Sequence, residues 1–432
     1  MKKLSLLLIL SLILLGSCKK DIPPVDTGVT PEQARDTLYY IMKAYYYWYG
    51  LMPAVDRENY SNPYDLLEAM RYQELDRWSF VADFDDFNDE MQGTFVGHGI
   101  RIGLGEDNKA RIAMIYKQAP LYAQGVRRGW IIKSVNGYDL SAIMLEGDGD
   151  AYNTALGPST AGVTNNFVFV NPGGTEVPIS SIKSSFTVNT VIMYDTIHLD
   201  GAGTKKAGHL VLESFILPTE EELKTAFAYF KAHNVTDLIL DLRYNGGGYL
   251  NIADYLASYI AGNSLTGTPF ATLKYNQKWQ SANFTYPFVN TASPLSLSRM
   301  VVITTRLTAS ASEAVMNGLA PHITVVSVGD TTNGKPMGMN GWPCGEKYFF
   351  WPITFKLVNS EDQGEYFDGL IPNQISTDDI SHDFDDRNEK CLKEAILYLQ
   401  TGSFSGKGSD SFSRGRQISE RPSWMNNTFL LK

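Results

Sequence analysis

The sequence has little cysteine and histidine and no excess of positive charge. Among 432 residues there are only 3 Cys and 6 His, and they do not stand at the spacing of a metal-ligand cluster. Lys and Arg number 37 against 47 Asp and Glu, which gives a formal net charge of −10. Phosphate backbones and anionic lipid surfaces repel a negative chain, so nucleic acid is not expected as a partner. Neither a metal nor another cofactor is expected.

A membrane span needs about 18 or more consecutive apolar residues. The sequence has no run of this length beyond the N-terminal segment. The N-terminus carries Lys2-Lys3 and then the 12 residues Leu4 to Leu15, which are apolar except for two serines. A run of this length is typical of a secretory signal. It ends in Leu15-Gly-Ser-Cys18, which is similar to a lipobox.

We therefore expect lipidation at Cys18, with the lipid as the only membrane contact. The expected location is the cell envelope, anchored to the outer membrane and facing the periplasm or the surface. The alternative is a plain secretory signal in which Cys18 is incidental. Beyond the signal only Cys344 and Cys391 remain, which are compatible with a disulfide or with two free thiols.

Composition, length and the alternation of strand and helix patterns together predict a multidomain α/β protein, α+β overall. Apolar residues make up 44% and charged residues 19%, as in globular proteins with a sizeable core, and the length suggests two or three domains. The expected parts are a signal peptide (1–18), a linker (19–29), a helical unit (30–92), a β-rich domain (93–187), an α/β core with a mostly parallel sheet (188–400) and a flexible tail (401–432).

Local patterns support this division. Thr30-Pro31-Glu32-Gln33 and Thr219-Glu-Glu-Glu222 both fit a capping box that opens a helix. The aromatic run Tyr45 to Tyr49 is expected to be core. The segment Leu238 to Leu242 is apolar enough for a strand covered on both faces, and strands alternate with helices around it, which favours a parallel sheet.

The β-rich stretch resembles a PDZ domain of bacterial proteases in the segments Gly97 to Gly103, Ala119 to Gly125 and Val126 to Gly137. A PDZ groove holds a C-terminal carboxylate on backbone N–H groups and adds the peptide as an extra strand. The resemblance implies a groove that is lined by His98, Gly99, Ile100 and Arg101. A β-rich structural module without an open groove is the alternative.

Two segments about 60 residues apart carry the chemistry. The first is Asp241-Leu-Arg-Tyr-Asn-Gly-Gly-Gly248, and the second is Ser310-Ala-Ser-Glu313, followed 25 residues later by Gly334-Lys335. Ser310 and Glu313 also fit a capping box, which is the structural alternative. His322 lies 12 residues beyond Ser310, roughly 18 Å along a helix, too far to act as its base. Ser312, two residues on, faces roughly the opposite side of a helix.

In these motifs, and in the order of its parts, the chain resembles the C-terminal-processing, or tail-specific, serine peptidases, in the lipoprotein branch that contains a PDZ domain. The resemblance implies that Ser310 is the nucleophile, that Lys335 is the base and that Glu313 orients the lysine. A lysine base must be neutral, so burial has to lower its pKa. The family often has Gln four residues after the lysine, where this chain has Met339.

Backbone N–H groups are expected to form the oxyanion hole. Ala311 follows the serine at a helix N-terminus, where N–H groups have no helical partner. The glycine loop can approach closely because it lacks side chains, and Gly247 is preferred over Gly248 as the second donor. Asp241 and Arg243 are expected to fix this loop.

The sequence thus predicts a lipid-anchored serine endopeptidase with a Ser/Lys dyad. Its expected partners are proteins or peptides with a free, apolar C-terminus. One alternative is a PDZ peptide-binding scaffold with weak or no catalysis, which Met339 would favour. Another is an esterase or thioesterase on a related α/β core.

Overall fold

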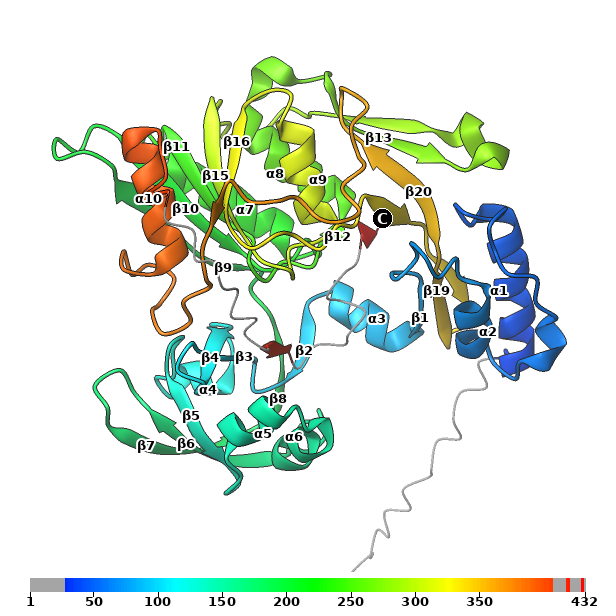
Figure 1. Ribbon diagram of the computed structural model, residues 1–432, viewed down its shortest axis with the longest axis horizontal. Helices are drawn as coiled ribbons and strands as arrows, with labels where there is room; N and C mark the ends of the chain where they lie inside the picture. The colour runs from blue at the N-terminus through cyan, green and yellow to red at the C-terminus, as the bar shows by residue number, and fades with distance from the viewer. Residues whose placement is uncertain (1–27, 407–416, 420–428, 431–432) are drawn as a thin grey trace, which may run out of the picture.

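Three parts follow one another along the chain in Figure 1: a helical unit, a β-rich module and an α/β core. The computed structural model describes residues 28–406, 417–419 and 429–430. The expected signal peptide 1–18 with Cys18, and the expected linker up to residue 27, lie outside the described residues. The expected mixed α/β class with a helical N-terminal unit is confirmed.

The helical unit is joined to the core by strand pairing. It contains α1 (Pro31–Tyr45), η1 (Arg57–Asn59), α2 (Pro63–Met70), β1 (Phe80–Asp83) and α3 (Phe84–Met91). The first capping box forms as expected, because Thr30 Oγ1 accepts from the Gln33 N–H while Gln33 Oε1 accepts from the Thr30 N–H. Strand β1 pairs antiparallel with β19 (Tyr348–Trp351), which itself pairs with β18 (Trp342–Cys344).

The β-rich module is an antiparallel sheet with short helices. Its strands follow the order β3-β4-β5-β6-β7, and β2 pairs with β8 where the chain enters and leaves the module. The elements are β2 (Thr94–Gly97), β3 (Ile100–Leu104), β4 (Ala110–Ile115), α4 (Pro120–Ala123), β5 (Ile131–Val135), α5 (Leu140–Glu146), α6 (Gly149–Leu156), β6 (Thr164–Val170), β7 (Glu176–Ile182) and β8 (Ser184–Thr187). Strand β3 also pairs with β22 (Gln417–Ser419).

The core contains the expected mostly parallel sheet, in the order β21-β16-β15-β11-β10-β9, where only β9 runs antiparallel to its neighbour. The strands are β9 (Val191–His198), β10 (Lys206–Leu212), β11 (Asp237–Asp241), β15 (Arg299–Thr304), β16 (Thr324–Gly329) and β21 (Gln374–Ile375). Strand β11 is buried on both faces: Leu238 and Leu240 join one hydrophobic cluster and Ile239 joins another.

Helices cover both faces of this sheet (Figure 1). They are α7 (Thr219–Ala232), α8 (Leu250–Ala261) and α9 (Ala311–Leu319) on one face and α10 (Lys390–Thr401) on the other. A second sheet lies beside them, in the order β12-β23-β17-β20-β13-β14. Its strands are β12 (Gly248–Tyr249), β13 (Pro269–Tyr275), β14 (Phe284–Pro287), β17 (Met337–Met339), β20 (Ile353–Val358) and β23 (Phe429–Leu430), and the 3-10 turns η2 (Asn263–Leu265) and η3 (Gln277–Ala282) lie between them.

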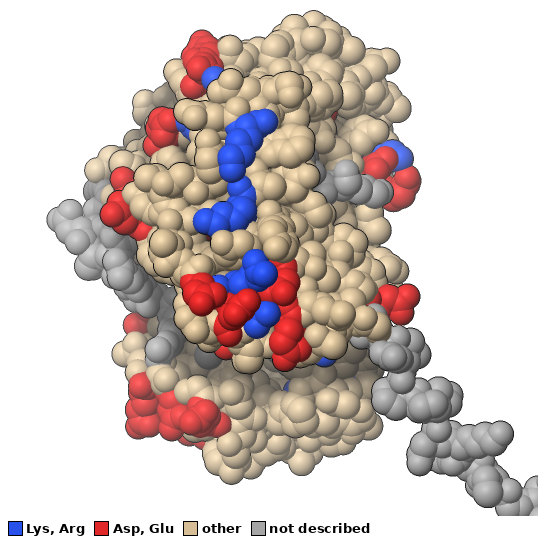
Figure 2. Space-filling view, turned by 90° about the vertical axis from the view of Figure 1, so that its right-hand side faces the viewer, with Lys and Arg blue, Asp and Glu red and all other residues tan. Residues whose placement is uncertain are grey.

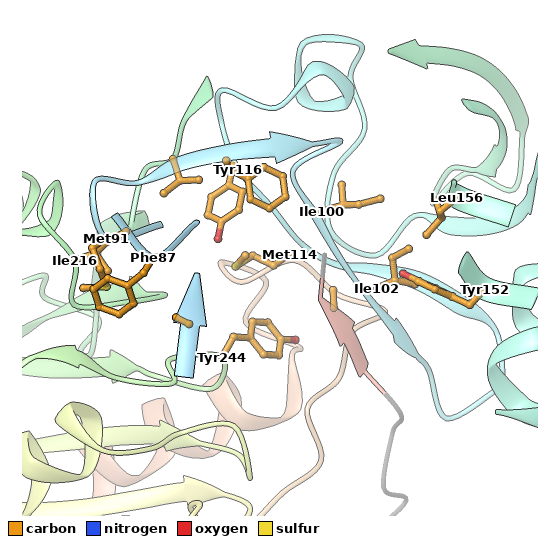
Figure 3. Close-up of a cluster of buried hydrophobic side chains, with 14 of the residues drawn as sticks. Phe87, Met91, Ile100, Ile102, Met114, Tyr116, Tyr152, Leu156, Ile216 and Tyr244 are labelled. Atoms are coloured by element: carbon orange, nitrogen blue, oxygen red, sulfur yellow. The ribbon is translucent and has the colours of Figure 1, made fainter. Parts of the chain in front are cut away.

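One hydrophobic cluster connects the three parts. It includes Phe87 of the helical unit, Ile102 and Met114 of the β-rich module and Tyr244 of the core, and all four are labelled in Figure 3. Because burial of apolar area stabilises a fold in proportion to that area, this shared cluster holds the β-rich module against the core.

On the face shown in Figure 2, acidic and basic side chains lie interspersed among large uncharged areas.

Two local expectations change in the structure, and the state of the two cysteines, left open by the sequence, is decided. The capping box at 219–222 is wrong, because the Glu222 carboxylate instead accepts from Thr190 and the Val191 N–H, which fixes the chain entering β9. Cys344 and Cys391 are buried free thiols rather than a disulfide. Within the expected tail 401–432, residues 417–419 and 429–430 form strands, while 407–416, 420–428 and 431–432 lie outside the described residues. In the described part of the chain, helices long and apolar enough for a membrane span are absent.

Candidate active site

Ser310 stands at the N-terminus of α9 in a conformation that is unusual for serine. Its φ is +61°, in the left-handed region that costs energy for residues other than glycine. The loop before it is held on the glycine-rich segment: Thr308 Oγ1 donates to the Leu242 carbonyl at 2.8 Å, and the Ala309 N–H donates to the Asn245 carbonyl at 3.0 Å. The Ser310 Oγ is buried and makes no hydrogen bond to the residues that the structure describes.

The Glu313 side chain connects Ser310 to the lysine loop. Its Oε2 accepts from the backbone N–H of Ser310 at 2.8 Å and from that of Lys335 at 2.9 Å. Its Oε1 accepts from the Gly334 N–H at 2.7 Å and from Thr332 Oγ1 at 2.5 Å. Burial raises the pKa of this carboxyl, and these hydrogen bonds oppose that shift. Glu313 therefore positions the backbone of both segments at once.

Lys335 is fully buried, and burial lowers its pKa well below the usual value. The negative charges of Asp76 and Glu313 oppose this shift without cancelling it. The turn before the lysine requires glycine, because Gly334 has φ +90° and a Cβ there would come within 2.3 Å of the Phe367 carbonyl oxygen. A buried, neutral amine is the form of lysine that can accept a proton.

Asp76 is the residue near this lysine that the sequence reasoning missed. It is buried in the helical unit, where its carboxylate accepts from Tyr46 Oη at 2.7 Å, from the Trp78 and Ser79 N–H groups and from Ser79 Oγ. Nothing in the local sequence around residue 76 indicates a site. The helical unit folds onto the lysine loop, where Trp78 Nε1 donates to Asn333 Oδ1 at 3.2 Å. This packing of two distant segments is what brings Asp76 near Lys335.

The glycine-rich loop leaves β11 and is fixed by buried ion pairs, as expected for Asp241 and Arg243. The Arg243 guanidinium contacts Asp241 at 2.7 Å, Asp378 at 2.7 Å and Glu389 at 3.0 Å. Beyond this anchor the Gly247 N–H donates to Asn245 Oδ1 at 2.9 Å, so that donor has a structural partner. Gly248 has φ +134°, and a Cβ there would come within 2.2 Å of the Phe215 carbonyl oxygen. Only glycine fits at position 248.

Ser310 and Ser312, at the start of α9, have different surroundings. Ala311 is the first residue of α9 and is fully buried, with its N–H at the positive end of the helix. Ser312 Oγ donates to the Asn245 carbonyl at 3.0 Å, so this hydroxyl ties α9 to the glycine-rich loop. His322, at the far end of α9, contacts Ser360 and Phe288 instead of this site.

Sequence profiles of two domains match the segments that build this site. Residues 206–373 match the profile described as Peptidase family S41, and residues 33–80 match the Peptidase S41 N-terminal domain. The chain belongs to the S41 peptidase family. The N-terminal match includes Asp76, and the larger match includes the glycine-rich loop, Ser310, Glu313 and Lys335.

Several curated proteins resemble this S41 chain over part of their length. It is 25% identical over 263 residues to the carboxy-terminal processing protease CtpB of Bacillus subtilis, which covers 60% of this chain and 51% of that protein. It is 24% identical over 281 residues to carboxyl-terminal-processing peptidase 1, chloroplastic, of Arabidopsis thaliana, with 64% and 54% covered. The chain thus spans about half the length of these relatives.

The fold also has a solved counterpart. A crystal structure of a Bacteroides fragilis protein named as an S41 protease superposes with a TM-score of 0.67 at 23% identity. The alignment covers 85% of this chain and 97% of that one. The S41 fold of the chain is thereby supported along most of its length.

The four residues expected to line a peptide groove lie at the start of β3. His98 is buried in the module, with its ring nitrogens at 3.1 Å from Ser181 Oγ and 2.7 Å from Asn165 Oδ1. Gly99 has φ +69° and its carbonyl accepts from the Tyr116 N–H. Ile100 is buried, and the Arg101 guanidinium lies over the Tyr244 ring at 5.3 Å. Their backbones border the β3 edge, whereas the His98 and Arg101 side chains contact other partners.

Buried polar contacts link the β-rich module to the glycine-rich loop. The Arg128 guanidinium donates to Tyr244 Oη at 2.6 Å and to Asp378 Oδ1 at 2.8 Å, and Tyr244 Oη donates to Asp378 Oδ2 at 2.5 Å. Burial alone would raise the pKa of Asp378, but the guanidinium groups of Arg128 and Arg243 hold it well below its usual range. The position of the module and that of the loop are therefore coupled through Tyr244 and Asp378.

Proposed function

We propose that this S41 chain is a serine endopeptidase with a Ser310/Lys335 dyad. The observation that carries the proposal is the shared Glu313 carboxylate, which holds the backbones of a serine at φ +61° and of a buried lysine with a lowered pKa. Such an arrangement activates a hydroxyl nucleophile without histidine.

In the proposed mechanism, Ser310 Oγ attacks the peptide carbonyl carbon while Lys335 Nζ takes the hydroxyl proton. The resulting ammonium returns the proton to the leaving amine, and the C–N bond breaks to give an acyl-enzyme. Water then attacks the ester, giving its proton to Lys335, and releases the acid together with the Ser310 hydroxyl. Ala311 and Gly248 are the proposed oxyanion donors, and Gly247 is the less favoured one because its N–H already binds Asn245.

For substrate selection we propose strand addition at the β3 edge of the β-rich module, which would act as a PDZ domain. A peptide with a free, apolar C-terminus would pair with β3 and place its carboxylate on the backbone before Ile100. Equal binding of a peptide and its C-terminally amidated copy would contradict the role of the carboxylate.

We also propose that lipidation at Cys18 anchors the enzyme to the outer membrane of the cell envelope, on the basis of the lipobox-like sequence.

The alternative, a peptide-binding scaffold with little or no catalysis, is favoured only by Met339, which stands where the resembled peptidases often have Gln. A fluorophosphonate probe and a casein digest separate the two functions. We expect the wild type to be labelled and to cleave casein, and Ser310→Ala to do neither while retaining its melting temperature. A wild type that is neither labelled nor active would favour the scaffold, and cleavage by Ser310→Ala would contradict the dyad.

A further inference from the structure

The short strand β23 lies between the two segments that carry the proposed catalytic groups. Phe429 pairs with Gly248 and Leu430 with Tyr249 of β12, in parallel orientation. Leu430 also pairs with Met339 of β17. Figure 1 shows β23, in red, beside β12. β23 thus fills the space between the glycine-rich loop and the segment that follows Lys335.

The flanking strands have the properties of peptide-binding edges. β12 begins at Gly248, a proposed oxyanion donor, and β17 begins at Met337, two residues after Lys335. In the sheet order, β23 is the neighbour of β12 and stands between β12 and β17. Unpaired strand edges accept an extended peptide through backbone hydrogen bonds, so a strand inserted here passes the reacting groups as a substrate would.

A second strand near the end of the chain occupies the edge proposed for substrate selection. β22 pairs antiparallel with β3, with Gln417 opposite Gly103, Ile418 opposite Ile102 and Ser419 opposite Arg101. Figure 3 shows this strand, in the red of the chain end, beside Ile102 and on the side toward Tyr244. β22 therefore runs toward the Gly99 turn, the direction in which a PDZ ligand runs.

We propose that β22 and β23 are a built-in competitor that blocks both peptide-binding edges of the enzyme in cis. The inference rests on the proposed function, because the edges matter only if peptides bind there. Ser310, Ala311 and Lys335 are all fully buried in this arrangement, so a substrate needs the site to be uncovered first. Displacement of the tail strands supplies that step.

The tail is a displaceable occupant for two physical reasons. A segment tethered to its own site has an effective concentration in the millimolar range, so a tail strand that binds its edge with an intrinsic Kd of about 100 µM weakens the binding of a competing peptide by about tenfold. The chain continues past Ser419, so β22 pairs as an internal strand and offers no terminal carboxylate. A ligand that ends in a carboxylate gains a contact that the tail lacks.

The spacing of the two strands also defines a substrate class. Nine residues lie between Ser419 and Phe429 in the sequence, and the ten residue steps that join them span at most about 33–36 Å when fully extended. A substrate that occupies both edges at once therefore needs a similar extended stretch between its β3-paired segment and its cleavage site. Extended polypeptide tails have this form, whereas short peptides reach one edge only.

The test compares peptide binding with and without the tail in the inactive background Ser310→Ala. A fluorescent 25-residue peptide with an apolar, free C-terminus is titrated into the full chain and into a chain that ends at Gly406, and the anisotropy gives Kd. We expect Kd to fall about tenfold on truncation and added tail peptide 407–432 to compete. Ile418→Pro and Leu430→Pro, which remove strand N–H groups, should each reproduce part of the gain, and Ser411→Pro should not.

The outcomes separate this inference from the proposed function. Equal Kd for the full and truncated chains, or no competition by the tail peptide, would overturn the inference. Hydrogen exchange is an independent check: amides of 100–104 and 337–339 should exchange faster after truncation, and unchanged protection at both segments would also overturn it. If the wild type fails to react with fluorophosphonate in both lengths, the peptidase proposal fails, while the binding and exchange results still decide whether the tail occupies the edges.

Discussion

The backbone N–H groups of Ser310 and Lys335 donate to the same oxygen, Oε2 of Glu313, at 2.8 and 2.9 Å. Two segments that are 25 residues apart are thereby fixed to one buried carboxylate. The sequence resemblance assigned Glu313 to orienting the lysine. In the structure Glu313 positions the backbone of the lysine, while burial lowers the pKa of the lysine amine.

The first prediction concerns the pH dependence of catalysis. If Lys335 is the base, as proposed, it must be neutral to act. Because burial lowers its pKa, kcat/KM should rise with pH and reach its plateau well below pH 10.5. Lys335→Ala should lose activity by at least about a hundredfold, the low end for a positioned base. A pH–rate profile of kcat/KM checks both, and an acid limb that is centred near the ordinary pKa of lysine would contradict the neutral base.

The same shift predicts a stability effect. Between the lowered pKa and about 10.4 the unfolded state binds one more proton at this lysine than the folded state, so the stability of the wild type increases with pH over that window. Lys335→Met removes the cost of burying this amine. Its melting temperature should exceed that of the wild type at pH 7, and the difference should shrink as the pH approaches 10. A Tm difference that does not change with pH would contradict this prediction.

Glu313→Gln should impair the site more than a simple loss of charge would. The carboxylate accepts four hydrogen bonds, and the amide nitrogen of Gln would face backbone N–H donors instead of accepting from them. We expect a loss of about 1–3 kcal/mol in the free energy of unfolding and a fall of more than tenfold in kcat/KM. Denaturant titration with the exposed Glu346→Gln as control checks this, and a fully active, stable Glu313→Gln would refute the positioning role.

Gly248→Ala tests the close approach of the glycine-rich loop. A Cβ at this position would lie 2.2 Å from the Phe215 carbonyl oxygen, so the loop must move. If Gly248 donates to the oxyanion, kcat should fall by about 10²–10³. Gly137→Ala is the matched control, because Gly137 also has a positive φ of +87° but open space around its Cβ. Similar kinetics for the two variants would argue against the donor role.

Arg128→Ala should weaken the attachment of the β-rich module to the core. Removing one partner from this buried ion pair with Asp378 is expected to cost about 3–5 kcal/mol, whereas Lys133→Ala at an exposed ion pair should cost less than about 1 kcal/mol. The lowered pKa of Asp378 gives stability that is present above about pH 4 and lost as the pH falls further. Denaturant titration should therefore show a smaller cost of Arg128→Ala at acid pH, and a pH-independent cost would contradict the ion-pair account.

Substitution of Cys18 tests the location of the enzyme. Cys18→Ala should abolish metabolic labelling with a fatty acid and leave an unprocessed precursor, while the catalytic segments remain unchanged. Gel mobility and mass spectrometry of the N-terminus measure both effects. Continued labelling of the variant would refute lipidation at this residue and would leave the peptidase proposal intact.

The sequence by itself determined the features that depend on neighbouring residues. The Thr30–Gln33 capping box, the strand at 238–242 and the parallel sheet follow from local periodicity and turn chemistry, and the structure bears them out. The hydrogen bond from the Ser310 N–H to the Glu313 carboxylate could likewise be predicted from the capping-box pattern, because the two residues are only three positions apart.

Tertiary structure decided the contacts between distant segments. Asp76 reaches the environment of Lys335 only because the helical unit folds onto that loop, and the Gly247 N–H is taken by Asn245 in a turn whose shape the glycines do not reveal. The pairing of Phe429 with Gly248 joins residues 181 positions apart, and no local pattern encodes it. Hydrogen bonds between residues close in sequence are fixed by backbone dihedral preferences, whereas pairings between distant segments depend on the path of the whole chain. For this reason the sequence predicted a flexible tail, whereas residues 417–419 and 429–430 form strands at the proposed peptide-binding edges.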